Sequence, residues 1–262
     1  MRWHLVYMLT GRNPTRRNRN IGTARRGHGQ NNQLVIPSSR ECFSALDRIG
    51  RYRKEERQIE GLNVSFIVEE LSADSVHPCT VDDVARVLGS IPASDWAGIK
   101  TIVFRQPTRK QAILNPVWGR LRYAGEVSTG HNYVVATGPM ILFDAIDENL
   151  RITWPASLNP QNQVELNRLR VDGHVIERAG RSYIIKVTAS SARSTQLYRT
   201  LFHEVGHWFD WLGKVEQPGR RGESYDDLID IYFARPVAER EAFARRYAED
   251  LRKRLSDAGR TS

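Results

Sequence analysis

His203-Glu204-Val205-Gly206-His207 is the stretch of this sequence that is most informative about its structure. Two histidines four residues apart lie one turn apart on the same helical face, so both imidazoles can bind one metal ion. The glutamate that follows the first histidine projects beside the pair, where it can accept a proton from water activated by the metal. The stretch therefore predicts a helix that carries most of a zinc site.

The surrounding sequence supports a helix over residues 194–212. Between Ser194 and Leu212 there is no proline, and Gly206 is the only glycine. Ser194 is suited to cap the start of the helix, and Gly213 stands where a C-terminal glycine is expected. At about 100° per residue, the large apolar side chains gather on one side and the two histidines on the other. The alternative is an ordinary amphipathic helix with two solvated histidines.

A catalytic zinc site needs a third protein ligand and leaves a fourth position open. The metzincin continuation would place Gly at 210 and His at 213, but this chain has Asp210 and Gly213. The gluzincin solution places a glutamate on a second helix further along. Residues 236–255 predict such a helix, with Pro236 in its first turn and a repeating apolar face.

Two glutamates of this second helix compete for the third ligand position. Glu241 lies about 60° from the centre of the apolar face, whereas Glu239 lies about 140° away. A carboxylate held against a protein core needs a compensating charge, and a cation is the usual one. Glu241 is therefore the predicted ligand, and Glu239 is predicted to be a solvated surface charge. The alternative for Glu241 is an ion pair with Arg245, four residues later.

The run from His203 to Asp210, followed by Glu241-Ala242-Phe243-Ala244, resembles the gluzincin zinc metallopeptidases. The nearest likeness is to the small catalytic domains related to the anthrax lethal factor protease. The resemblance implies an α+β zincin-like domain with a small mixed sheet, an active-site helix and a C-terminal ligand helix. It also implies that Zn²⁺ is held by His203, His207 and Glu241, and that Glu204 is the general base.

The chain departs from this family at several positions. Arg245 stands where the family has a second glutamate, and Ala234 stands where it has an oxyanion-binding tyrosine. Tyr232 is the favoured catalytic substitute and Tyr225 the other candidate; a tyrosine packed in the core is the alternative. Asp210 is expected either to orient an imidazole N–H or to make a simple polar contact.

The rest of the domain, residues 41–262, gives a coarser prediction. A helix is expected over 80–88, strands over 101–104 and 140–143, and a hairpin over 175–187 that turns at 179–181. Residues 125–138 are expected to form a loop at the cleft, in which His131 could contact the substrate. By the resemblance, residues 139–147 form an edge strand that binds extended peptide, or else a central strand.

The first forty residues carry eight arginines and no acidic residue, so they hold most of the formal net charge of +9. This composition predicts a disordered basic tail over residues 1–40, which is either a solvated extension or a weak contact for nucleic acid or another anionic surface. No run is long enough to span a membrane. Cys42 and Cys79 cannot build a disulfide framework, and a cytoplasmic location is expected, with signal-independent secretion left open.

The sequence therefore favours a zinc-dependent peptidase that acts on a protein or peptide substrate. A catalytically inactive, zinc-stabilised binding module is the alternative, with or without a nucleic-acid contact through the arginine-rich tail. Glu204 separates the two, because a purely structural zinc site has no use for a carboxylate beside its histidines.

Overall fold

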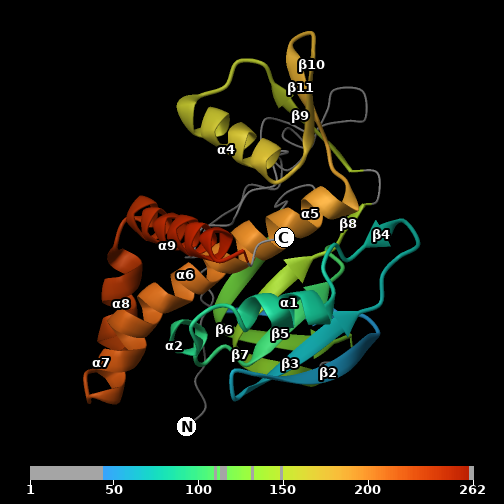
Figure 1. Ribbon diagram of the computed structural model, residues 1–262. Helices are drawn as coiled ribbons and strands as arrows, with labels where there is room; N and C mark the ends of the chain where they lie inside the picture. The colour runs from blue at the N-terminus through green and yellow to red at the C-terminus, as the bar shows by residue number, and fades with distance from the viewer. Residues whose placement is uncertain (1–43, 109–110, 113–116, 131–132, 148–149, 260–262) are drawn as a thin grey trace, which may run out of the picture.

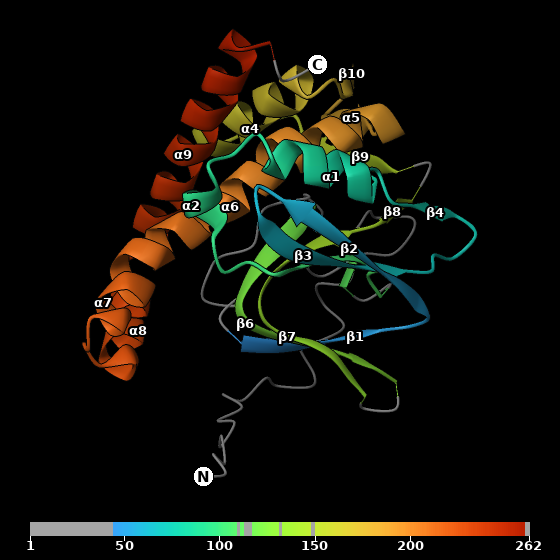
Figure 2. The same cartoon turned by 60° about the horizontal axis from the view of Figure 1, so that its bottom comes forward.

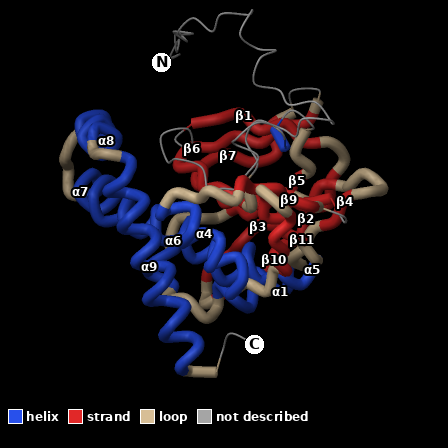
Figure 3. The backbone as a smooth tube through the Cα atoms, turned by 90° about the horizontal axis from the view of Figure 1, so that it is seen from above, coloured by secondary structure: helices blue, strands red, loops and turns tan. Residues whose placement is uncertain are grey.

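The computed structural model describes residues 44–108, 111–112, 117–130, 133–147 and 150–259 (Figure 1). The predicted basic tail, residues 1–40, lies outside the described residues, as do Cys42 and His131. The described chain forms a main sheet with helices along one side of it and a smaller lobe beside it (Figures 1 and 2). Figure 3 shows α6, α7, α8 and α9 in blue to one side of the strands in red.

The main sheet has six strands in the order β1-β6-β7-β5-β3-β2. These strands are β1 (Ser44–Ile49), β2 (Tyr52–Ile59), β3 (Leu62–Glu69), β5 (Thr101–Arg105), β6 (Gly119–Thr129) and β7 (Val134–Asp144). The pairs β1/β6, β7/β5 and β5/β3 are parallel, whereas β6/β7 and β3/β2 are antiparallel. The predicted α+β class with a mixed sheet is therefore confirmed.

The two strands predicted from apolar runs lie in the middle of this sheet. Residues 101–104 fall in β5, whose five residues are all buried, and residues 140–143 fall in β7. Because β7 pairs with β6 on one side and β5 on the other, residues 139–144 form a central strand. Of the two alternatives for residues 139–147, the central strand is therefore confirmed for residues 139–144, and the peptide-binding edge strand is wrong.

The loop predicted over residues 125–138 is also wrong, because residues 119–129 belong to β6 and residues from 134 onward belong to β7. Gly125 lies within β6, at an irregularity in the β6/β7 register. A Cβ atom at Gly125 would lie 2.8 Å from Arg122 Cβ and 3.0 Å from Met140 Sδ. The glycine therefore permits a close approach inside a strand.

Helices cover the face of the main sheet that bears most of the apolar core. Of the helices on this side, α1 (Val81–Leu88) contacts β2, whereas α2 (Ala93–Trp96), α8 (Tyr225–Ala234) and α9 (Val237–Asp257) pack on the long helical segment over residues 189–220. The predicted helix over 80–88 is confirmed as α1, with Thr80 as its cap and Asp83 completing a capping box. The core side chains beneath the helices include Phe66, Leu121 and Trp208. None of the described helices has the length and apolarity needed to cross a bilayer.

His203 and His207 lie in a long helical segment that runs from Ala189 to Arg220. It consists of α5 (Ala189–Thr195), η3 (Gln196–Thr200), α6 (Leu201–Trp211), η4 (Leu212–Glu216) and α7 (Gln217–Arg220), where η3 and η4 are π-helical turns. The predicted limits of 194–212 are wrong at both ends. Thr188 caps the start of the segment through the backbone N–H of Ser191, and the helix continues through Gly213.

The smaller lobe lies between the main sheet and the long helical segment in the sequence. It contains β9 (Arg151–Pro155), α4 (Pro160–Val171), β10 (Val175–Ala179) and β11 (Ser182–Lys186), with its strands in the order β10-β11-β9. The hairpin predicted over 175–187 is confirmed. A second apolar cluster, which includes Trp118, Trp154 and Leu166, forms its core. The short strands β4 (Ser75–Val76) and β8 (Ile146–Asp147) pair with each other.

Candidate metal centre

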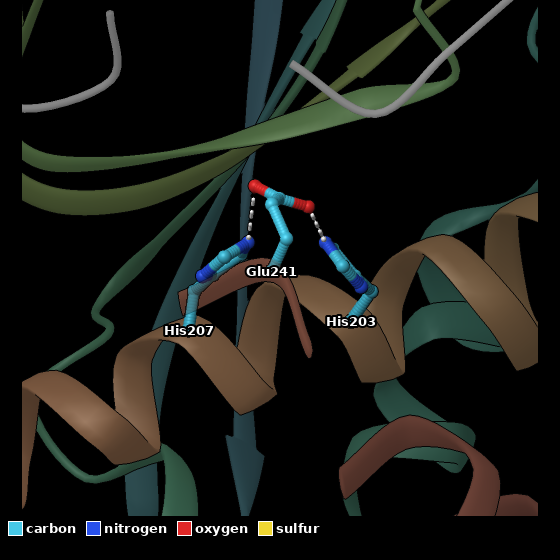
Figure 4. A group of neighbouring side chains, drawn as sticks. All are labelled: His203, His207 and Glu241. Carbon is cyan, nitrogen blue, oxygen red and sulfur yellow. Dashed lines mark ion pairs between the residues drawn. The ribbon is translucent and has the colours of Figure 1, made fainter. Parts of the chain in front are cut away.

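His203, His207 and Glu241 form a buried group that could hold a metal ion. His203 Nε2 lies 3.2 Å from Glu241 Oε2, and His207 Nε2 lies 3.3 Å from Glu241 Oε1 (Figure 4). One ligand atom from each of the three residues lies within 4.8 Å of the others. Both histidines rise from the same face of α6, and Glu241 reaches them from α9, which packs along α6.

The chemistry of these atoms fits a divalent cation. His203 Nε2, His207 Nε2 and Glu241 Oε1 are buried and make no hydrogen bond. Burial lowers the pKa of His203 to about 4, and the neighbouring His207 adds to the effect, so the His203 imidazole is neutral near pH 7. A neutral imidazole and a carboxylate are the forms that bind zinc, and two histidines with one glutamate are a known catalytic zinc set.

Glu204 lies beside this group and is held by the main sheet. Its Oε2 accepts a hydrogen bond of 2.8 Å from the backbone N–H of Leu121 in β6, while its Oε1 makes no hydrogen bond. Burial raises the pKa of the Glu204 carboxyl to about 7. One oxygen is thus fixed and the other is available to accept a proton, as a general base requires.

The two competing glutamates of α9 are separated as the sequence predicts. Glu241 is buried with the histidines, and no ion pair joins it to Arg245, which is exposed. Glu239 has a side chain that is 56% exposed and that pairs with Arg235 over 2.7 Å. The structure therefore brings Glu241 to the metal-binding group and leaves Glu239 on the surface.

Tyr232, the predicted oxyanion-binding residue, lies in an aromatic cluster. Its ring is 5.0 Å from that of Trp211 and 6.0 Å from that of Tyr123, and its hydroxyl oxygen lies 3.3 Å from that of Tyr123. Burial raises its pKa above the usual range for tyrosine. Tyr225 is partly exposed, and its hydroxyl donates to the Glu216 backbone carbonyl over 3.5 Å. These contacts do not support an oxyanion-binding role for either tyrosine.

Asp210 does not orient an imidazole. Its Oδ2 accepts a hydrogen bond of 2.6 Å from Arg235 Nη1. His207 Nδ1 makes no hydrogen bond with the described residues. Of the two readings of Asp210, the contact with a histidine is therefore wrong and the simple polar contact is confirmed, because Arg235, which follows α8, binds the carboxylate. Asp230 of α8 is exposed. Within the described ranges, no fourth His, Cys, Asp or Glu joins the metal-binding group.

Two features at the site were not predicted from the sequence. The first is the Leu121 backbone N–H, which no side-chain pattern could reveal because the contact is between residues 83 positions apart. The second is Arg240, which is fully buried and lies over the rings of Tyr232 and Phe233. A sequence signal for Arg240 existed, because it stands four residues before Ala244 on the apolar face of α9.

Comparisons of the chain with protein-family models, with curated proteins and with solved structures found no match.

Proposed function

We propose that this protein is a zinc-dependent peptidase of the gluzincin type. The observation that carries the proposal is the arrangement of Glu204 beside the group formed by His203, His207 and Glu241. That arrangement combines a three-residue ligand set with a carboxylate that is held by one oxygen and open at the other. Such a combination is typical of metal-assisted hydrolysis.

Each residue of the site then has a distinct role. His203, His207 and Glu241 would hold zinc, which supplies Lewis acidity toward a carbonyl oxygen and lowers the pKa of water. Glu204 Oε1 would take a proton from the attacking water and pass it to the leaving amine. The Leu121 N–H would keep the Glu204 side chain in one orientation during both transfers, because its 2.8 Å hydrogen bond occupies Oε2.

The number of ligands supports a catalytic site over a structural one. Structural zinc sites are closed by four protein ligands, whereas catalytic sites keep one position open for water or substrate. Among the described residues only three candidates converge. Asp210 is occupied by Arg235 and so does not complete a closed set.

The proposal is tested by measuring zinc and hydrolysis in the same preparations. We expect about one zinc per chain in the wild type and in Glu204→Gln, and a loss of zinc in His203→Ala. Hydrolysis is measured by mass spectrometry on a mixture of unfolded proteins and on a peptide library. Glu204→Gln is expected to lower the rate by about 10²–10⁴-fold, because removal of a general base costs that much.

Two results would contradict the proposal. Wild-type protein that binds no zinc after reconstitution would remove the metal centre. Glu204→Gln that hydrolyses as fast as the wild type would remove the mechanism. Zinc binding by the wild type without hydrolysis of any library member would instead favour a zinc-stabilised binding module.

A further inference from the structure

Arg240 is a buried cation with no hydrogen-bonding partner among the residues that the structure describes. Its side chain has no exposed surface, and Nε, Nη1 and Nη2 all lack a hydrogen bond. Its guanidinium carbon lies over two rings of the described chain, 5.5 Å from the Tyr232 ring centroid and 5.0 Å from that of Phe233. A guanidinium stays charged in proteins, and an unpaired buried charge is costly, so its retention needs an explanation.

The other buried arginines of the described chain do have carboxylate partners. Arg105 binds both Asp47 and Asp144, Arg120 binds Asp144, and Arg122 binds Asp47. Arg235, which also lies over the Tyr232 ring, is paired with Asp210 and Glu239. Arg240 therefore stands out as the buried arginine whose planar set of donors is not used within the protein.

The position of Arg240 connects it to the metal centre. It directly precedes Glu241 in α9, and its guanidinium lies over Tyr232, whose hydroxyl contacts that of Tyr123. Tyr123 follows Leu121 by two residues in β6, and Leu121 holds Glu204. Two strand residues span roughly 7 Å. A peptide that runs along the site would therefore bring a group one or two residues from the reacting bond toward this corner.

We propose that Arg240 binds a carboxylate of the peptide ligand, at a position one or two residues from the bond that is cleaved. The choice of a peptide carboxylate rests on the proposed peptidase function. The chemistry follows from the guanidinium, whose fork of N–H donors matches a carboxylate in a bidentate pair. The carboxylate would belong either to an acidic side chain or to the free C-terminus of the peptide.

The two aromatic rings prepare Arg240 for this role. Contacts through the face of a ring hold a guanidinium in place but leave its in-plane N–H groups unused. The carboxylate would therefore meet a donor set whose orientation is already fixed. Because Arg240 is closed to solvent in the ligand-free protein, the corner between α8 and α9 must open to admit the ligand.

The test measures carboxylate preference in binding, without relying on hydrolysis. Three peptide probes are compared: acetyl-tetraalanine with a free carboxylate, its C-terminal amide, and the amide of acetyl-Ala-Ala-Glu-Ala. The affinity of each probe for the full chain is measured by calorimetry and by tryptophan fluorescence. Fluorescence is suitable because the ring centroid of Trp211 lies 5.0 Å from that of Tyr232, the ring that Arg240 contacts. The titrations are made with zinc and again in the presence of a chelator, because zinc itself can bind a carboxylate.

We expect at least one carboxylate probe to bind tenfold or more tightly than the amide, with and without zinc. Arg240→Met should abolish this preference, and Arg240→Lys should reduce it, because a lysine lacks the planar fork. Arg245→Met is the matched control, since it removes an exposed arginine of the same helix, and should keep the preference. The probe that is preferred identifies the source of the carboxylate.

A stability measurement excludes a purely structural role. Because Arg240 is unpaired, Arg240→Met should leave the melting temperature unchanged or raise it, whereas Arg235→Met should lower it by breaking two ion pairs. A fall in the melting temperature of Arg240→Met equal to that of Arg235→Met would overturn the proposal. So would an absence of carboxylate preference in the metal-free wild type. Neither result would affect zinc binding or hydrolysis, which test the proposed function separately.

Discussion

Gly206 of α6 lies directly against the backbone of Ala244 in α9. A Cβ atom at Gly206 would lie 3.0 Å from both Ala244 Cα and Ala244 O, and 3.1 Å from Tyr247 Cδ1. Backbone atoms cannot move aside as the end of a flexible side chain can, so a side chain at position 206 would require the two helices to shift apart by a few tenths of an ångström. The crossing also sets how far Glu241, one turn before Ala244, can reach toward His203 and His207.

We therefore predict that Gly206→Ala weakens both the fold and the metal site. The added methyl group would push α9 away from α6, at a cost of about 1–3 kcal/mol in the free energy of unfolding. The same displacement would move Glu241 away from the histidines and lower zinc affinity. Urea denaturation of the metal-free chain gives the first quantity, and competition with a chelator gives the second.

Gly213→Ala is the matched control for this prediction. Gly213 lies in the same helical segment, and a Cβ atom there would meet nothing within 4 Å. Alanine is favoured over glycine inside a helix, so Gly213→Ala should stabilise the protein by about 0.5–1 kcal/mol and leave zinc affinity unchanged. Equal effects of the two substitutions would show that the contact with Ala244 does not limit the approach of the helices.

The ligand set can be tested by comparing the two glutamates of α9. Glu241→Ala is expected to lower zinc affinity by more than about 100-fold, because even residues that only support a ligand contribute 10–100-fold. Glu239→Ala should leave zinc affinity within error of the wild type, since Glu239 is exposed and pairs with Arg235. Zinc titration with a competing chelator measures both. Loss of zinc in Glu239→Ala with retention in Glu241→Ala would reverse the assignment.

The positions of the candidate ligands could be predicted because they depend on local helical geometry. His203 and His207 share a face through their spacing alone, and Glu241 was separated from Glu239 by its angle to the apolar face of one helix. The strands over 101–104 and 140–143 were predictable for a similar reason, since each is a short apolar run that the sheet buries.

Long-range contacts could not be predicted in this way. Tyr232 was a plausible oxyanion ligand by its position in the sequence, but its surroundings are set by Tyr123, 109 residues away. Asp210 points along the metal face of its helix, yet Arg235 takes its carboxylate. The limits of the long helical segment were misjudged because Gly213 has no capping role, and a glycine alone does not reveal the backbone conformation around it.

The edge strand β1 is held to the main sheet by a buried network of charges. Asp47 of β1 accepts hydrogen bonds from Arg105 Nη1 over 2.5 Å and from Arg122 Nε over 3.0 Å. Asp144 accepts from Arg105 Nε over 2.6 Å and from Arg120 Nη2 over 2.7 Å. We predict that Asp47→Asn lowers the free energy of unfolding by about 3–5 kcal/mol, because it removes the charged carboxylate that binds both Arg105 and Arg122 in a buried network.

The control for Asp47→Asn is an exposed ion pair on the same sheet. Lys54 and Glu56 of β2 lie 3.1 Å apart, with side chains that are 51% and 58% exposed. Glu56→Gln should change the free energy of unfolding by less than about 1 kcal/mol. Both values come from urea denaturation at one pH. An effect of Asp47→Asn as small as that of Glu56→Gln would show that the network is dispensable.

His174 supplies a prediction about stability and pH. Its Nε2 lies 2.9 Å from Thr195 Oγ1, and the Thr195 hydroxyl donates to Asp172 Oδ2 over 3.0 Å. The single hydroxyl proton of Thr195 is used in the hydrogen bond to Asp172, so Thr195 Oγ1 can only accept from His174. His174 Nε2 therefore carries the hydrogen in this contact. Its Nδ1 is buried and makes no hydrogen bond. Burial lowers the pKa of His174 to about 4, against an ordinary value of 6.5.

Because the pKa of His174 is lower in the folded chain, the unfolded chain takes up the proton first as the pH falls. The stability that comes from a neutral His174 is complete above pH 6.5 and is lost progressively toward pH 4, by up to roughly 3 kcal/mol. Urea denaturation of the metal-free wild type and of His174→Gln at pH 7 and pH 4.5 measures this contribution. Glutamine keeps an N–H for Thr195 but does not titrate, so the variant should lose less stability between the two pH values. If the wild type and His174→Gln lose the same free energy of unfolding between pH 7 and pH 4.5, His174 is not buried in the neutral form. The contacts between residues 172–174 and α5 would then be different in solution.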